Sequence, residues 1–339
     1  MISSITNGPR QSNMELLRII AMFLVLVVHA DFWALGGPTA EDFSLNPLSA
    51  VTRTIIESIS IVCVNVFILI SGWFGIKPSL KGFCNFVFQC AFFLFGIYAI
   101  MLVTGYAQLS YKGIAGCLCL TSANWFIRAY VGLYILAPIL NTFIDKSSKR
   151  TIELFLITFF IFQTIWGWSG AAKFFEQGYS TFSFIGLYIL ARYTRQYANK
   201  KLSTWGGHIY VFSVIANTIL YFFLRKVGMG IDAYSYINPI VIIASLGLIL
   251  HFSNLKVGHS KVINWIAKSS FGVFLIHSNP NISESIFKAL MINVYESYNG
   301  IICVVVSFLV LSGVYVLGTL FDQPRKWLWE LIFSRFISK

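Results

Sequence analysis

The sequence has few charged residues: Asp, Glu, Lys and Arg together make up 11% of its 339 residues. A soluble domain carries about 25%, because its surface must be solvated. No segment is polar enough to form such a domain, so the composition excludes an ordinary water-soluble enzyme. The chain is instead 57% hydrophobic and contains 32 Phe, which is typical of a surface in contact with lipid. We therefore predict a single membrane domain over residues 1–339.

Acidic residues are scarce even within this small charged fraction. There are 13 Asp and Glu against 25 Lys and Arg, which gives a net charge of +12. A nucleic-acid-binding protein gathers its basic residues into one patch or stripe. Here they stand singly or in pairs between apolar runs, as they do in the cytoplasmic loops of membrane proteins. The charge pattern therefore indicates a membrane-lipid environment and no nucleic-acid partner.

The sequence also lacks the residue spacing of a metal site. Cys117-Leu-Cys119 has no second pair at the distance that a zinc site requires. His29, His277 and Glu57 can in principle bind zinc, but their spacing shows no metal signature. We expect no bound metal and no bound cofactor.

Apolar runs long enough to cross a bilayer recur through the whole chain. A membrane-spanning helix needs about 20 predominantly apolar residues. The runs lie at 14–33, 51–72, 83–105, 122–143, 151–169, 181–197, 206–224, 237–255, 262–279 and 299–321. This pattern predicts an all-α, polytopic membrane protein with about ten transmembrane helices.

The loops between these ten predicted helices are alternately rich and poor in Lys and Arg. Arg18 and Arg128 lie within predicted helices. If the N-terminus is cytoplasmic, 17 of the 25 Lys and Arg fall on the cytoplasmic side. The outer loops hold Arg53, Lys112, Lys173, Arg225, Lys226 and Lys288. Because cytoplasmic loops are enriched in Lys and Arg, we expect both termini to be cytoplasmic. The expected location is the cell inner (plasma) membrane.

The first predicted helix carries two ionisable side chains on one face. Arg18 and His29 are separated by about three turns, or about 16 Å along the helix axis. Ionisable groups inside a membrane are costly and often functional. Glu15 can pair with Arg18 near the cytoplasmic end, whereas His29 lies in the outer half. The alternative is that Arg18 extends to the inner headgroups and His29 only bonds a neighbouring helix. Their shared face argues against that alternative.

The second predicted helix carries Glu57 and Asn65 and ends at Ser71 and a glycine. Glu57 can orient His29 or stabilise its charge if the two helices pack together, or it can form an i,i+4 pair with Arg53. Asn65 lies near the middle of the membrane, where an amide joins helices by hydrogen bonds. Ser71 and the glycine allow a close approach between backbones.

Two later helices bring polar groups to about the depth of His29. The fourth predicted helix starts on the outer side with Trp125 and Arg128, and the ninth ends there with His277. Trp125 alone is typical of a membrane-interface residue. Together with Glu57, these side chains predict a polar site in the outer half of the membrane.

Four segments of the chain contain motifs in a recognisable order. They are an acidic residue and Arg followed by His over residues 14–29, Phe-x-x-x-Ser-Gly within 64–73, Trp…Tyr…Pro over 125–138, and Gly-aromatic-Leu-Ile-His within 270–277. These segments resemble the acyltransferase-3 family of integral-membrane O-acyltransferases, which modify envelope glycans. Glu15 stands where Asp is usual in that family.

This resemblance implies transfer of an acyl group, specifically O-acetyl, to a hydroxyl of a cell-surface polysaccharide or lipid-linked glycan. The implied co-substrate is acetyl-CoA, an acyl-CoA bound from the cytoplasmic side. His29 is then expected to act as general base or as transient acyl carrier. Arg18 is expected to bind donor phosphates or to hold the geometry through Glu15.

The remaining candidates are assigned to the substrates. Glu57 joins His29 and Arg18 as a catalytic candidate, and Arg128 and His277 are expected to contact the acceptor or to stabilise an oxyanion. The other substrate-binding candidates are Trp125, Ser71 and Asn65.

A transporter or flippase for an envelope polysaccharide intermediate is the alternative function. It would use the polar face of the first helix as a pathway. Many transporters carry inverted repeats, and none is visible in this sequence, which disfavours that alternative. The sequence leaves the oligomeric state open.

Overall fold

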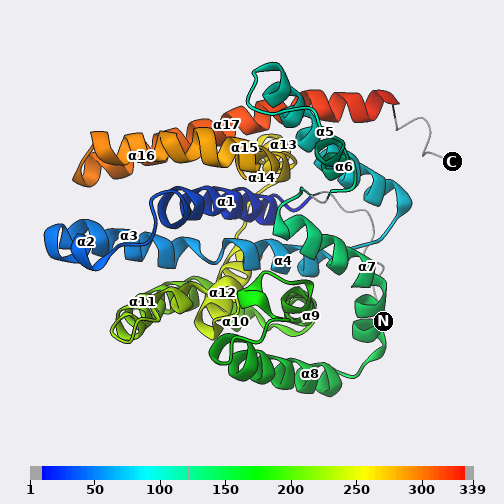
Figure 1. Ribbon diagram of the computed structural model, residues 1–339. Coiled ribbons are helices and arrows are strands. Elements are labelled where there is room, and N and C mark those ends of the chain that lie inside the picture. The colour runs from blue at the N-terminus through cyan, green and yellow to red at the C-terminus, as the bar shows by residue number, and fades with distance from the viewer. Residues whose placement is uncertain (1–9, 121, 333–339) are drawn as a thin grey trace.

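The computed structural model describes residues 10–120 and 122–332. Within these ranges the regular elements are helices and no strand is present, which confirms the predicted all-α class. Figure 1 shows most of the long helices side by side in one bundle. Helix α1 (Ser12–Val28) begins and α17 (Gly300–Ile332) ends at the same end of that bundle. This arrangement agrees with an even number of membrane crossings.

Eight helical segments of the described chain are long and apolar enough to cross a membrane. Each coincides with one of the predicted spans. They are Ser12–Trp33 (α1 and the π-helical turn η1, His29–Trp33), Pro47–Phe74 (α3, Pro47–Ser60, and α4, Cys63–Phe74), Leu80–Val103 (α5), Trp125–Lys146 (α7), Lys149–Ser169 (α8, Lys149–Phe162, and η2, Gln163–Ser169), Gly206–Arg225 (α11), Gly230–Asn254 (η4, Gly230–Tyr234, and α12, Pro239–Asn254) and Gly300–Ile332 (α17). The chain is thus a polytopic membrane protein.

The other two predicted spans are shorter or interrupted. α9 (Thr181–Tyr197) has 17 residues and matches the run predicted at 181–197. The run at 262–279 is not one helix, which corrects the prediction: it is divided into α13 (Lys261–Ala267) and α14 (Ser270–His277). At the break, the backbone N–H of Ser269 donates to Ile266 only three residues earlier. Such a change in hydrogen bonding cannot be predicted from the length of an apolar run.

Short helices occupy the segments between the spans, where we predicted only loops. They are α2 (Ala40–Leu45), α6 (Tyr111–Leu118), α10 (Lys200–Thr204), α15 (Pro280–Ile282) and α16 (Lys288–Ser297), with the short turns η3 (Glu176–Gly178) and η5 (Ser283–Phe287). α17 also continues to Ile332, beyond the predicted end at 321.

The centre of the bundle is formed by α1, α4, α9 and α12. α4 contacts both α1 and α9, and α1 contacts α12, α13 and α14. In Figure 1, α1 and α4 lie between α13, α14 and α17 on one side and α9, α11 and α12 on the other. Gly72 allows the close approach of α4 to α9, because a Cβ there would lie 2.5 Å from the Tyr188 carbonyl oxygen. The central position of α1 places its polar residues inside protein.

Candidate active site

Two cavities lie along α1, one at each end. The inner cavity, of about 460 Å³, includes Arg18 and lies near the start of α1. The outer cavity, of about 630 Å³, includes His29 and Glu57. The two residues that the sequence placed on one face of the first helix therefore contribute to different cavities.

His29 is held by a second histidine. The Nδ1 atom of His29 lies 3.0 Å from Nε2 of His277, and His277 is 1% exposed. The other His277 nitrogen, Nδ1, is 2.8 Å from the Val273 carbonyl oxygen. Because a carbonyl only accepts, His277 Nδ1 must carry the hydrogen in that bond.

This bond fixes the protonation pattern of the pair. In a neutral His277 ring, Nε2 then has the lone pair and accepts the hydrogen from His29 Nδ1. The remaining nitrogen of His29, Nε2, is left with its lone pair, which is the form that a general base requires. The sequence expected His277 to contact substrate, whereas the structure places it against His29.

The backbone around His29 departs from a regular α-helix. α1 passes at His29 into η1, a π-helical turn of five residues, and such turns are frequent at functional sites. The turn is fixed by Asp31, which is buried and forms an ion pair with Arg53 from α3, with the Arg53 Nε and Asp31 Oδ1 atoms 2.5 Å apart. Arg53 also donates to the carbonyl oxygen of Gly36. One arginine thus holds both the turn and the chain that follows it.

Glu57 is 1% exposed and lines the outer cavity. Its Oε2 atom has no hydrogen-bond partner among the described residues. Arg53 pairs with Asp31, so the Arg53–Glu57 pair considered from the sequence is not the one formed. No hydrogen bond joins Glu57 to His29 in the described part of the chain, and His277 is the ring that contacts His29.

The far wall of the outer cavity is aromatic. Trp125 lies with its ring centroid 4.3 Å from that of Tyr179 and 6.1 Å from that of Tyr236. All three line the cavity. Gln177, beside them, has a positive φ of 53°, and its carbonyl oxygen accepts hydrogen bonds from Tyr236 N and Ser235 Oγ. Strained backbone held by surrounding bonds is common at binding sites.

The inner cavity is lined by five basic side chains. Arg10 and Arg18 pair with Glu15, which is 5% exposed, at 3.5 and 3.2 Å. The other basic residues of the lining are Lys268, Arg325 and Lys326, and Glu330 is its acidic member. This charge distribution suits an anion.

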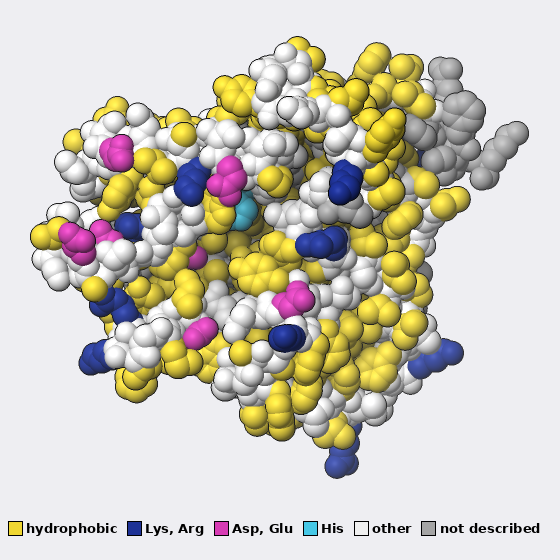
Figure 2. Space-filling model, viewed as in Figure 1, with side chains coloured by type: hydrophobic (Ala, Val, Ile, Leu, Met, Phe, Trp, Pro, Cys, Tyr) yellow, Lys and Arg dark blue, Asp and Glu magenta, His cyan; other side chains and the backbone are white. Residues whose placement is uncertain are grey.

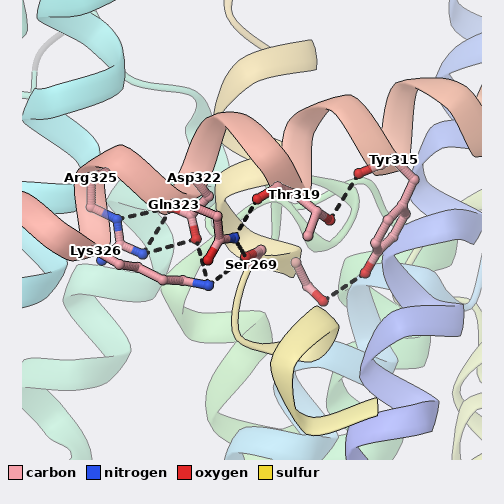
Figure 3. A network of polar contacts seen from close by, with 8 residues as sticks. Ser269, Tyr315, Thr319, Asp322, Gln323, Arg325 and Lys326 are labelled. Atoms are coloured by element: carbon pink, nitrogen blue, oxygen red, sulfur yellow. Dashed lines mark hydrogen bonds and ion pairs between the residues drawn. The ribbon is translucent and has the colours of Figure 1, made fainter. Parts of the chain in front are cut away.

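A buried polar network positions Arg325 and Lys326 on that cavity (Figure 3). Asp322 is fully buried and accepts from Arg325 Nε at 2.9 Å and Nη2 at 3.0 Å. Its Oδ2 atom lies 3.3 Å from Lys326 Nζ, which also donates to Ser269 Oγ at 2.6 Å. Gln323 donates to the same Ser269 oxygen at 3.2 Å. The network therefore joins α17 to the break between α13 and α14.

One side chain, Phe126, lines both cavities. Its ring lies 5.8 Å from that of Tyr130 on the inner side and 5.4 Å from that of Phe274 on the outer side. Tyr130 lines the inner cavity and Phe274 the outer one. The two cavities thus adjoin at an aromatic boundary.

The other candidate residues predicted from the sequence lie in different parts of the structure. Trp125 lines the outer cavity and Ser71 the inner one, where the Ser71 Oγ is 3.3 Å from the Tyr130 hydroxyl. Asn65 is 1% exposed and donates to the Tyr236 carbonyl oxygen at 2.8 Å, as a residue that joins helices does. Arg128 is exposed and is absent from the lining of both cavities.

Sequence reasoning did not identify the Asp322 network or the Asp31–Arg53 pair. Asp322, Arg325 and Lys326 follow the predicted end of the last span, where charged residues are ordinarily solvated. The signal available was their i,i+3 and i,i+4 spacing, which favours ion pairs within a helix. Nothing local in the sequence links Asp31 to Arg53.

Comparison with curated proteins and with solved structures gives no match. A family model described as an acyltransferase domain matches residues 11–321, which is most of the chain. That range includes Arg18 in α1, His29 in η1 and His277 in α14. The chain therefore belongs to the acyltransferase-3 family and is a multi-pass membrane acyltransferase.

Proposed function

We propose that the protein transfers an acetyl group from acetyl-CoA to a hydroxyl of a cell-surface polysaccharide or lipid-linked glycan at the inner membrane. The observation that carries this proposal is the position of His29. It lies on the outer cavity with one ring nitrogen bonded to His277, and that cavity adjoins a basic cavity at Phe126. A donor and an acceptor can thus approach one base from opposite sides.

The inner cavity suits the donor. Acetyl-CoA carries several phosphate groups on its nucleotide end, and basic side chains bind phosphate by charge-assisted hydrogen bonds. Arg18, Arg325 and Lys326 line this cavity, and the carboxylates of Glu15 and Asp322 hold them in place. The uncharged pantetheine arm then extends past Phe126 toward His29.

The chemical step follows from the free His29 nitrogen. His29 Nε2 takes the proton of the acceptor hydroxyl, and the hydroxyl oxygen attacks the thioester carbonyl carbon. The tetrahedral intermediate collapses with cleavage of the carbon–sulfur bond, and His29 returns the proton to the departing CoA thiolate. The products are the acetyl ester and CoA. Transfer through a transient acetyl group on His29 gives the same products in two steps.

Isotope-labelled acetyl-CoA tests the proposal. Membranes containing the full chain are incubated with the label, and their glycans are analysed by mass spectrometry before and after mild alkaline treatment. The expected result is label in the glycan fraction as an alkali-labile ester. Movement of a glycan across the membrane without incorporation of label would favour the transporter alternative instead.

A further inference from the structure

The outer cavity has an unbalanced charge. Three acidic residues line it, Glu57, Asp232 and Glu284, and no Lys or Arg belongs to its described lining. They come from separate parts of the fold: Glu57 from α3, Asp232 from η4 and Glu284 from η5. Figure 2 shows the corresponding hollow on this face, with a His side chain visible in it and both acidic and basic side chains at its rim.

Glu57 indicates which kind of ligand group the cavity accepts. Its side chain is 1% exposed, it lines the cavity, and its Oε2 atom lacks a hydrogen-bond partner within the described chain. A buried acceptor without a partner is costly. A sugar hydroxyl can satisfy it by donating a hydrogen bond, whereas a carboxylate or phosphate of the ligand has no hydrogen to donate.

Two cations near this lining, Arg53 and Lys288, offset its charge only in part. Arg53 is engaged by Asp31, with 2.5 Å between Arg53 Nε and Asp31 Oδ1. Lys288 lies 4.0 Å from Glu284, and their side chains are 40% and 60% exposed; such surface pairs interact weakly. Its ammonium also lies 5.9 Å from the centre of the Trp33 ring, at the edge of the cavity. Glu57 and Asp232 have no basic partner in any ion pair of the described residues.

The rest of the lining suits an uncharged ring. Trp125, Tyr179 and Tyr236 form a connected aromatic wall, and aromatic faces pack against the apolar carbon–hydrogen faces of sugars. Amide and hydroxyl groups from Asn124 and Ser278 also line the cavity. These groups bind hydroxyls without requiring a charge on the ligand.

We propose that the outer cavity selects a sugar residue that carries no carboxylate, phosphate or sulfate, and that Asp232 and Glu284 exclude acidic sugars by repulsion. Discrimination by a repelling element is a general source of specificity. This inference rests on the proposed acyl transfer to a glycan, because it concerns the acceptor of that reaction.

The first test identifies the sugar residue that receives the label. Membranes of the cells that produce the protein are supplied with isotope-labelled acetyl-CoA, and tandem mass spectrometry assigns the ester to a residue of the glycan. The expected site is a neutral or amino sugar. An ester on a uronic acid, a sialic acid or a phosphorylated residue would overturn the selectivity while leaving acyl transfer intact. The absence of labelled glycan would instead reject the proposed function itself.

The second test changes the charge of the cavity. A double variant, Asp232→Asn with Glu284→Gln, keeps the shape of both side chains, and Glu57 is left unchanged because it is a catalytic candidate. Removal of two charges near the acceptor should raise the ratio of label on acidic to neutral sugars by about tenfold. Because this ratio is internal to each sample, a lower amount of folded protein does not affect it.

The matched control is Glu41→Gln. Glu41 is an exposed acidic residue of α2 and is not part of the cavity lining, so its variant should show the wild-type ratio. The same ratio in the wild type, the control and the double variant would contradict the proposal.

Discussion

The two cavities along α1 differ in the sign of their charge. The inner cavity collects five basic side chains around the start of α1, and two buried carboxylates, Glu15 and Asp322, hold four of them. The outer cavity has three acidic side chains and no basic one in its described lining. One helix thus connects a site suited to an anion with a site suited to an uncharged ligand, and His29 lies on the second.

This difference indicates a division of work between the two sites. We propose that the basic inner cavity binds the phosphates of the donor, so changes there should act on the donor. We propose that His29, held by His277, transfers the proton in the outer cavity, so changes there should act on the chemical step. Variants of the two cavities are therefore expected to have separable kinetic effects.

The largest effect is expected for His29→Ala. Loss of a general base lowers the rate by about 10²–10⁴-fold, and label incorporation should fall by that factor. The matched control is His208→Ala, since His208 is exposed on α11 and lines neither cavity. Acetylation by His29→Ala at the rate of the control would remove His29 from the mechanism.

A smaller loss is expected for His277→Ala. His277 acts through His29 and touches no substrate in our account, so the variant should lower kcat by about 10–100-fold, as loss of an orienting partner does. The KM values for both substrates should stay unchanged. His277→Gln keeps an acceptor oxygen for His29 Nδ1 and should recover part of the rate. An effect of His277→Ala on KM for the acceptor alone would indicate substrate contact instead.

Arg18→Ala should affect the donor. Loss of one charge-assisted hydrogen bond to phosphate should raise KM for acetyl-CoA by about tenfold, with KM for the acceptor unchanged. Arg150→Ala provides the control, because Arg150 is exposed at the start of α8 and lines neither cavity. Equal changes in the KM values for acetyl-CoA and for the acceptor would contradict the assignment of the donor to the inner cavity.

The smallest effect is expected from salt. Added salt screens the attraction between exposed charges, so KM for acetyl-CoA should rise about two- to threefold between low and physiological ionic strength. A neutral acceptor should show no such change. Initial rates at a series of salt concentrations give the KM values for both substrates. A rise in KM for the acceptor alone would contradict the assignment of the charged donor to the inner cavity and the neutral acceptor to the outer one.

Much of the fold could be predicted because a bilayer imposes simple rules. A span needs a long apolar run, and each of the eight long apolar segments coincided with such a run. The break at Ser269 could not be predicted in this way, because the segment stays apolar on average while the polar partners of Ser269 come from α17. The extension of α17 was missed for a different reason: charged residues end the apolar run, although Asp322 and Arg325 neutralise each other within the helix.

The sequence could predict how deep each candidate residue lies in the membrane, but not which way each helix turns its side chains. Periodicity along one helix placed Arg18 and His29 on a common face, and both line cavities. The same depth argument included Arg128, which is exposed on α7. Whether a residue on another helix faces the site depends on how that helix is turned, and this is set by packing between distant segments. The contact between His29 and His277 is of that kind.

The most direct test of the account is the side from which acetyl-CoA acts. Acetyl-CoA does not cross a sealed membrane, so labelled acetyl-CoA is added to right-side-out and to inverted membrane vesicles, with His29→Ala vesicles as background. If the basic inner cavity takes the donor from the cytoplasmic side, inverted vesicles should incorporate label and right-side-out vesicles should remain at background until they are opened. Equal incorporation by sealed vesicles of both orientations would contradict a donor site at the Arg18 end of α1.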